Sequence, residues 1–259
     1  MAEEKRQFPT EVVSLPSKGH YYSKDDPLSS GEIEIKYMTA KEEDILTSQN
    51  LIRRGIVIDK LLEALVVDEK VNLNTMLIGD KNGLMVAARI LGYGKEYNFE
   101  VDCPACAEHN KDSIDLTTFK DKVVDTSKHD KGKNEFTFKL PATKVELTYK
   151  FLTQKDERAI DEELKAMKKI SKGTGIDPEI TTRMKKTIIA IDGERNRTKV
   201  NKFVDEQFLS VDSLEFRRHL QETLPDVDMS YLFECSLCAY EEEMTVPMTV
   251  QFLWPAARR

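Results

Sequence analysis

The stretches "CPAC" (Cys103–Cys106) and "CSLC" (Cys235–Cys238) contain all four cysteines of this 259-residue chain. A Cys-x-x-Cys turn points two thiolates at one centre, and two such turns supply the tetrahedral four-sulfur site of structural Zn²⁺. The usual gap between the pairs is about 15–20 residues, but here it is 128 residues. Because loop closure becomes only slowly less favourable with length, an insertion that folds on itself is tolerated. We therefore predict one structural zinc ion per chain, bound by Cys103, Cys106, Cys235 and Cys238.

The sequences that flank both cysteine pairs have the alternation of β-strands. "YNFEVDCPAC" leads into the first pair and "AEHNKDSIDL" predicts a turn and a return strand, while "SYLFECSLC" leads into the second pair. After it, one strand face is predicted for Val246, Met248, Val250 and Phe252. Strand, cysteine turn and strand, repeated twice, is the pattern of a zinc ribbon. His109 lies close to the first pair, and with four thiolates present we expect it to be a surface residue.

Other uses of the cysteines are a redox dithiol, an iron–sulfur cluster or independent buried thiols. A thioredoxin-like dithiol opens a helix in a βαβ unit, and neither pair does so. An iron–sulfur cluster also takes four cysteines, but we rank it below zinc. The chain starts without a secretory signal and has no long apolar run, so we expect a reducing compartment, which disfavours disulfides.

The remaining sequence predicts an α+β protein, with a split four-cysteine zinc-ribbon-like β core, an N-terminal helical subdomain and a helical insertion between the knuckles. "Knuckle" here means a Cys-x-x-Cys turn with its flanking residues. Leu15, Tyr21 and Tyr22 are too apolar for a solvated tail, so the N-terminal arm is expected to pack either on a neighbour or on its own domain. The predicted divisions are 1–30, an extended arm; 31–96, a helical subdomain with a short leading strand; 97–153, the first knuckle and a β-hairpin; 154–228, the helical insertion; and 229–259, the second knuckle and a C-terminal strand.

Several boundaries follow from local signals. Thr39 and Glu42 form a capping box at the start of a helix, and a later helix is expected from about Asp80 to Leu91, stopped by Gly92. Thr153 is expected to cap the first insertion helix. The remaining predictions are a short strand in "GEIEIKYM", a helix in "VIDKLLEALV", a hairpin turning near Pro141–Lys144, and a helix begun by Asp177 and Pro178 that runs through Met184 and Ile188.

Charge and motif content limit the classes of function. The net charge of −7 disfavours bulk affinity for nucleic acid or an anionic membrane. A basic cluster in the insertion is interleaved with acidic residues, which is typical of a solvated helix face. No phosphate-binding loop, zinc-protease motif or serine triad is evident, so we expect no enzyme and no catalytic residues. The basic cluster consists of Lys165, Lys168, Lys169, Lys172, Arg183, Lys185 and Lys186.

Five stretches in a fixed order carry a resemblance to a known family. They are "LPSKGHYY", "GEIEIKYMTAKEEDIL", "MLIGDKNGLMVAARILGYGKEY", "LPDVDMSYLFECSLC" and "VQFLWP". Together they resemble the T-even-type bacteriophage baseplate family, the hub subunit and hub-assembly proteins of contractile tails. The resemblance runs from about Leu15 to Pro255 and is weakest through 155–205.

The resemblance implies a non-enzymatic tail protein that contacts other baseplate or tail-hub proteins. It implies a location in the host cytoplasm during assembly, in the virion baseplate, or in both, with no membrane contact.

A nucleic-acid-binding zinc-ribbon accessory protein of a phage is the alternative, and a dithiol redox enzyme is the third hypothesis. The oligomeric state is left open, as is the role of Trp254, which either packs over the ribbon or anchors an interface.

Overall fold

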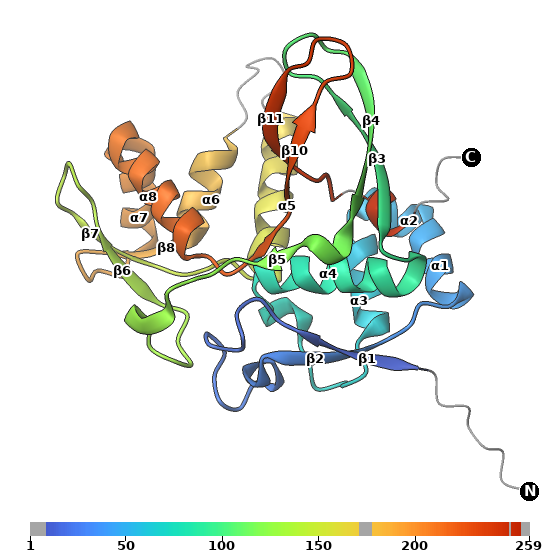
Figure 1. Cartoon of the computed structure of the whole chain (residues 1–259). Helices are drawn as coiled ribbons and strands as arrows, with labels where there is room; N and C mark the ends of the chain where they lie inside the picture. The colour runs from blue at the N-terminus through green and yellow to red at the C-terminus, as the bar shows by residue number, and fades with distance from the viewer. Residues whose placement is uncertain (1–8, 171–177, 249, 255–259) are drawn as a thin grey trace, which may run out of the picture.

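The computed structural model describes residues 9–170, 178–248 and 250–254. A helical body carries two long β-hairpins that project together from it, and a second group of helices with a three-stranded sheet lies beside it (Figure 1). The helices are α1 (Ala40–Thr47), α2 (Gln49–Arg54), α3 (Val57–Leu65), α4 (Ile78–Tyr93), α5 (Gln154–Ile170), α6 (Glu179–Thr187), α7 (Arg197–Glu206), α8 (Ser210–Thr223) and α9 (Val250–Leu253). The strands are β1 (Thr10–Ser14), β2 (Glu32–Lys36), β3 (Glu96–Asp102), β4 (His109–Asp115), β5 (Lys120–Asp121), β6 (Phe136–Lys139), β7 (Glu146–Tyr149), β8 (Ile188–Ile191), β9 (Val227–Asp228), β10 (Ser230–Glu234) and β11 (Glu241–Thr245).

The N-terminal segment belongs to the body of its own chain. Strand β1 pairs antiparallel with β2 over five residue pairs. Leu15, Tyr21 and Tyr22 are at most 6% exposed and lie in the main core. Of the two placements that the sequence left open, the structure therefore has the arm packed on its own domain.

The helix signals in the N-terminal half are confirmed, with one shifted end. The capping box at α1 is present, because the Glu42 carboxylate accepts from the backbone N–H of Thr39 at 2.9 Å. The sequence predicts that the fourth helix stops at Gly92, but α4 continues to Tyr93 and ends at Gly94, whose φ of 83° suits glycine. Gly92 instead lets the Met38 side chain approach the helix closely.

The first turn of α4 joins three segments that are distant in sequence. The Asp80 carboxylate is fully buried and accepts from the Ser17 backbone N–H at 2.8 Å, the Ser17 hydroxyl at 2.7 Å and the Tyr22 hydroxyl at 2.5 Å. Burial raises the pKa of Asp80, and these hydrogen bonds oppose that rise. On the same turn, Gly79 lies against the backbone of Pro225. The motifs "LPSKGHYY", "IGD" and "LPDVD" therefore meet at one point of the fold.

A short strand pair closes the long insertion. Strand β5 pairs with β9, and the backbone N–H of Lys122 donates to the carbonyl of Asp226 at 2.8 Å. Between these strands lie the β6–β7–β8 sheet and helices α5 to α8. The predicted β6–β7 hairpin and the Thr153 cap are both present. Because β5 and β9 pair at the base of the insertion, its first and last residues lie side by side. One end connects to β4 and the other to β10.

One predicted helix end in the insertion is wrong, and one predicted helix start lies outside the described residues. Ile188 does not continue α6 but begins β8, because the apolar run Ile188–Ile191 pairs with β7 in the core. Asp177, expected to start α6, lies outside the described residues.

The C-terminal strand expected through Val246, Met248, Val250 and Phe252 is not formed. Strand β11 ends at Thr245, Pro247 follows, and residues 250–253 are helical. The helical turn buries both Phe252 and Leu253 completely, which an alternating strand would not do. Trp254 packs against the main core, which includes Tyr97 and Phe99 of β3, and not against the small cluster around the cysteines.

The close approach at Gly79 gives a testable expectation. A Cβ on Gly79 would lie 1.8 Å from the carbonyl oxygen of Pro225, whereas one on Gly92 would meet the flexible Met38 side chain. We expect Gly79→Ala to lower the free energy of unfolding by about 1–3 kcal/mol, and Gly92→Ala to change it by less than about 1 kcal/mol. Urea denaturation would measure both, and equal midpoints would contradict the packing described here.

Candidate metal centre

The two knuckles have the same backbone design. In the first, the N–H of Cys103 donates to the carbonyl of Glu108 at 2.8 Å, and the N–H of Ala107 donates to the carbonyl of Cys103 at 2.8 Å. In the second, the N–H of Cys235 donates to the carbonyl of Tyr240 at 2.9 Å, and the N–H of Ala239 donates to the carbonyl of Cys235 at 3.0 Å. The two alanines have φ values of 59° and 54°, a left-handed conformation that folds each turn back under its first cysteine. Each knuckle therefore aims two sulfurs in one direction.

The tertiary structure brings all four predicted cysteines together. Their Sγ atoms lie within 4.8 Å of one another, and the 3.7 Å contacts join Cys103 to Cys238 and Cys106 to Cys235. A tetrahedral ion with metal–sulfur bonds of about 2.3 Å places its sulfurs about 3.8 Å apart. The S–S bond of a disulfide is about 2.05 Å, far shorter than these contacts. The four thiols thus fit one tetrahedral metal ion.

The pKa values of the clustered thiols shift in different directions. Backbone N–H donation from Cys238, with help from Leu237, lowers the pKa of Cys235 to about 6. The N–H of Glu108 likewise favours the Cys106 thiolate, but desolvation and the neighbouring thiols outweigh it and raise the pKa of Cys106 to about 12. Four thiolates this close repel one another strongly, and a divalent ion at their centre would remove that repulsion.

Asn110 links the two knuckles, and this role was not predicted from the sequence. It lies on β4 and is 6% exposed. Its Oδ1 accepts from the N–H and the hydroxyl of Ser236 at 2.9 and 2.8 Å. Its Nδ2 donates to the carbonyl of Glu108 at 2.9 Å and to Sγ of Cys235 at 3.7 Å. The only sequence signal was an asparagine inside the return strand, a residue type depleted in strands.

His109 behaves as expected for a surface residue. Its side chain is 58% exposed and turns toward two carboxylates, with Nδ1 2.7 Å from Asp102 and Nε2 3.2 Å from Glu100. Hydrogen bonding to Asp102 and then Glu100 raises the pKa of His109. These contacts hold both ring nitrogens away from the cysteine cluster.

A buried arginine fixes the base of the first hairpin to the body. Arg89 of α4 is 3% exposed, and its guanidinium donates to the carbonyls of Gly94 and Glu96 at 2.8 and 2.9 Å. It also lies 5.6 and 5.8 Å from the ring centres of Tyr93 and Tyr97. Burial lowers the pKa of Arg89. The arginine therefore joins the end of α4 to the start of β3.

Three members of the basic cluster in the insertion form ion pairs with acidic residues of neighbouring helices. Arg183 pairs with Glu157 at 2.6 Å, Lys185 with Asp205 at 2.7 Å and Lys186 with Glu163 at 3.2 Å. Lys172 lies outside the described residues. These pairs join different helices, whereas the sequence pattern indicated i,i+4 pairs along one helix face; the Arg183–Glu179 pair at 3.0 Å is of that kind.

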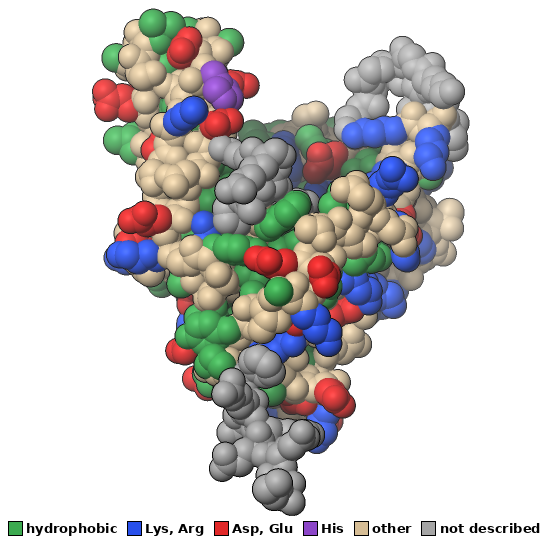
Figure 2. All heavy atoms as spheres, turned by 90° about the vertical axis from the view of Figure 1, so that its right-hand side faces the viewer, with side chains coloured by type: hydrophobic (Ala, Val, Ile, Leu, Met, Phe, Trp, Pro, Cys, Tyr) green, Lys and Arg blue, Asp and Glu red, His purple; other side chains and the backbone are tan. Residues whose placement is uncertain are grey.

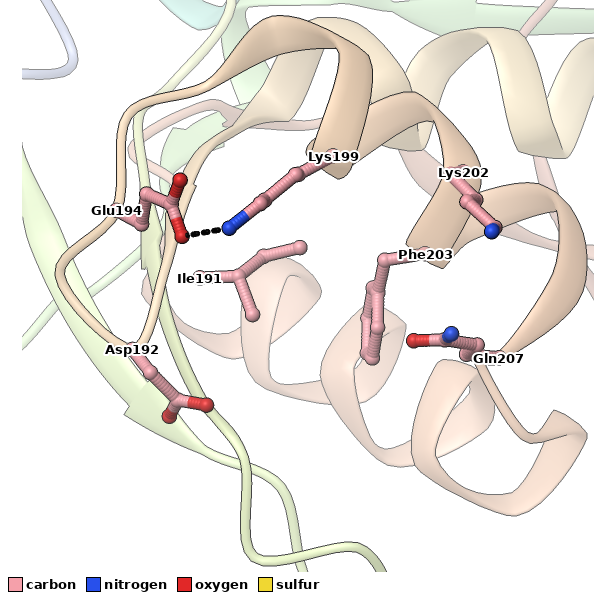
Figure 3. A pocket seen from close by; sticks show the side chains of 7 residues that line it. All are labelled: Ile191, Asp192, Glu194, Lys199, Lys202, Phe203 and Gln207. Atoms are coloured by element: carbon pink, nitrogen blue, oxygen red, sulfur yellow. Dashed lines mark hydrogen bonds and ion pairs between the residues drawn. The ribbon is translucent and has the colours of Figure 1, made fainter.

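Two surface cavities are lined by residues that the sequence reasoning passed over. One, of about 360 Å³, has Ile191 and Phe203 as its apolar side and an ion pair between Lys199 and Glu194 at its rim (Figure 3). The other, of about 550 Å³, contains His129 and His219.

Both of these histidines are hydrogen-bonded to tyrosines from other segments. The Tyr21 hydroxyl lies 3.0 Å from Nδ1 of His129, and the Tyr149 hydroxyl lies 2.6 Å from Nε2 of His219. Burial lowers the pKa of both imidazoles. The pairs tie the N-terminal segment and α8 to the β6–β7 region, and only the tertiary structure brings them together.

Comparison with protein families identifies the class to which this fold and its cysteine cluster belong. The family model for the T4 bacteriophage base plate protein matches residues 10–254. The chain therefore belongs to this family of phage baseplate proteins, which confirms the resemblance carried by the five sequence stretches. No curated protein and no solved structure matches the chain. None of the described helices is long and apolar enough to cross a membrane.

Removing one thiol tests the metal centre. Cys235→Ser leaves three sulfur ligands, so we expect metal content to fall well below one ion per chain and the melting temperature to fall by about 10 °C. Leu237→Ser, in the same knuckle but 68% exposed, is the matched control and should change neither. Elemental analysis and thermal unfolding would measure both, and a Cys235→Ser protein that keeps its metal would exclude a four-cysteine site.

Asn110→Asp tests the bridge between the knuckles. The variant keeps the acceptor for Ser236 but loses the donor to Cys235 and adds a negative charge beside the thiolates. We expect metal affinity to fall about 10- to 100-fold, measured by competition with a chelator. Asn98→Asp on the exposed side of β3 makes the same change away from the sulfurs, and a similar loss in both variants would refute a specific role for Asn110.

Proposed function

We propose that the chain is a non-enzymatic structural protein of the phage tail, which acts in assembly of the baseplate hub or as a component of the baseplate. The observation that carries this proposal is the family match over residues 10–254. It acts through contacts with other phage tail proteins, in the host cytoplasm during assembly and, where it is retained, in the virion.

A structural zinc ion is the second part of the proposal. The four sulfurs within 4.8 Å support it, because that spacing suits a single tetrahedral ion. When bound, the ion would hold two hairpins whose cysteines lie 128 residues apart. A hairpin pair of this size has little core of its own: among the described residues, its buried cluster consists of Cys103, Phe233 and Cys235. The metal would supply stability that this small core lacks.

The placement of the charged and sulfur groups supports a binding role. The 3.7 Å sulfur contacts join cysteines of different pairs, an arrangement suited to metal binding and not to a Cys-x-x-Cys redox dithiol. The basic residues of α6 are paired with glutamate or aspartate, which weakens the nucleic-acid alternative.

A complementation experiment tests the proposal. Cells infected by a phage that lacks this gene would be supplied with the tagged wild-type chain, and baseplates would be separated on gradients before and after nuclease treatment. We expect baseplate assembly to fail without the chain, to be restored by it, and the co-purifying tail proteins to survive nuclease, with about one zinc per chain. Normal baseplates in its absence, or partners lost with nuclease, would refute the proposal.

A further inference from the structure

The β10–β11 hairpin presents one sheet face that no described part of its own chain covers. Side chains alternate along a strand, and Phe233 of β10 is fully buried toward the cysteines. Its neighbours Leu232 and Glu234 therefore point the other way. We call this side the outer face; it consists of Ser230, Leu232, Glu234, Glu241, Glu243 and Thr245. Leu232 is 70% exposed at its centre, and Leu237 in the adjoining knuckle is 68% exposed.

The arrangement of carboxylates around Leu232 destabilises the hairpin. Glu234 lies directly opposite Glu241, and Leu232 lies directly opposite Glu243. Like charges facing each other across strands are destabilising. The hairpin, residues 230–245, contains four glutamates and no lysine or arginine. Within the described parts of the chain, Glu234, Glu241 and Glu243 form no ion pair, so the fold itself gives no reason for this arrangement.

The first hairpin provides an internal comparison. On the corresponding side of β3–β4, carboxylates are paired within the chain: Glu100 and Asp102 with His109, and Asp115 with Lys95 at 2.8 Å. Figure 2 shows acidic, basic and histidine side chains close together on the projecting lobe. Glu96 of this face also lies directly opposite a carboxylate, Asp115, but Asp115 is paired with Lys95. The two hairpins thus differ in degree: three carboxylates of β3–β4 have partners within the chain, whereas those around the exposed Leu232 have none among the described residues.

We propose that the outer face of β10–β11 docks on another tail protein, with Leu232 entering an apolar pocket rimmed by lysine side chains. This inference rests on the proposed role in baseplate assembly. Burying three carboxylates beside a leucine requires cations on the partner, and the face repels the phosphates of nucleic acid and of anionic lipid. A second copy is a poorer match, because the chain itself is acidic, with a net charge of −7.

Carbodiimide cross-linking tests the contact directly, because it joins a carboxylate to a lysine that touches it. Purified metal-loaded protein would be added to an extract of cells infected by a phage lacking this gene, treated with carbodiimide and digested for mass spectrometry. We expect links from Glu234, Glu241 or Glu243 to lysines of one other tail protein. Links from these glutamates to a second copy of the chain, or their absence while other carboxylates are linked, would overturn the proposal.

Variants separate docking from folding. Glu234→Gln with Glu241→Gln, and separately Leu232→Ser, should each lower the yield of complete baseplates in the extract by about tenfold. Asn98→Lys with Ser113→Lys shifts the net charge equally, at directly opposite positions of the other hairpin, and should not. Because the glutamine pair removes like-charge repulsion, its melting temperature should equal or exceed that of the wild type.

These outcomes distinguish the two proposals. If the wild-type chain does not restore baseplates in the extract, the proposed function fails. If the wild type restores them and the glutamine and serine variants do so equally well, the function stands and the docking face is wrong.

Discussion

The meeting of four cysteine sulfurs is the constraint on which the rest of this structure depends. Two hairpins with cysteines 128 residues apart must place their sulfurs within 4.8 Å. The insertion between them must therefore leave and return at nearly the same point, and the β5–β9 pair ensures this. Asn110 then adds direct hydrogen bonds between the knuckles. The long insertion is compatible with a tight metal centre because its base is closed by backbone hydrogen bonds.

A second junction holds the projecting hairpins to the helical body. In the first turn of α4, Asp80 is hydrogen-bonded to the N-terminal segment. Gly79 of the same turn contacts Pro225, where the chain leaves the insertion. The other end of the same helix is joined to β3 by Arg89. One helix thus contacts the start of the chain, the end of the insertion and the base of the β3–β4 hairpin. The position of the hairpins relative to the body is set by buried hydrogen bonds at both ends of α4.

Local signals in the sequence predicted local structure well. The knuckles, the capping box of Thr39 and Glu42, and the β6–β7 hairpin each depend on residues a few positions apart. The errors arose where a distant contact decided the outcome. Ile188 had the period of a helix but found a strand partner in β7, and Phe252 alternated like a strand residue but is buried together with its neighbour Leu253. Asn110 and the histidine–tyrosine pairs had no local signature at all.

The sequence by itself determined the two Cys-x-x-Cys turns, because cysteine type and spacing within each turn are local, and it predicted one shared site from their chemistry. That the two turns meet was decided by the tertiary structure. The sequence also determined the family, since five motifs stand in a fixed order. Only the tertiary structure decided what those motifs do, bringing "LPSKGHYY", "IGD" and "LPDVD" together around Asp80 and Gly79. It also decided that Leu232 and its surrounding glutamates face outward, while three carboxylates of the β3–β4 hairpin are paired within the chain. The physical reason is that burial and ion pairing depend on which segments meet in space, which no single stretch of sequence specifies.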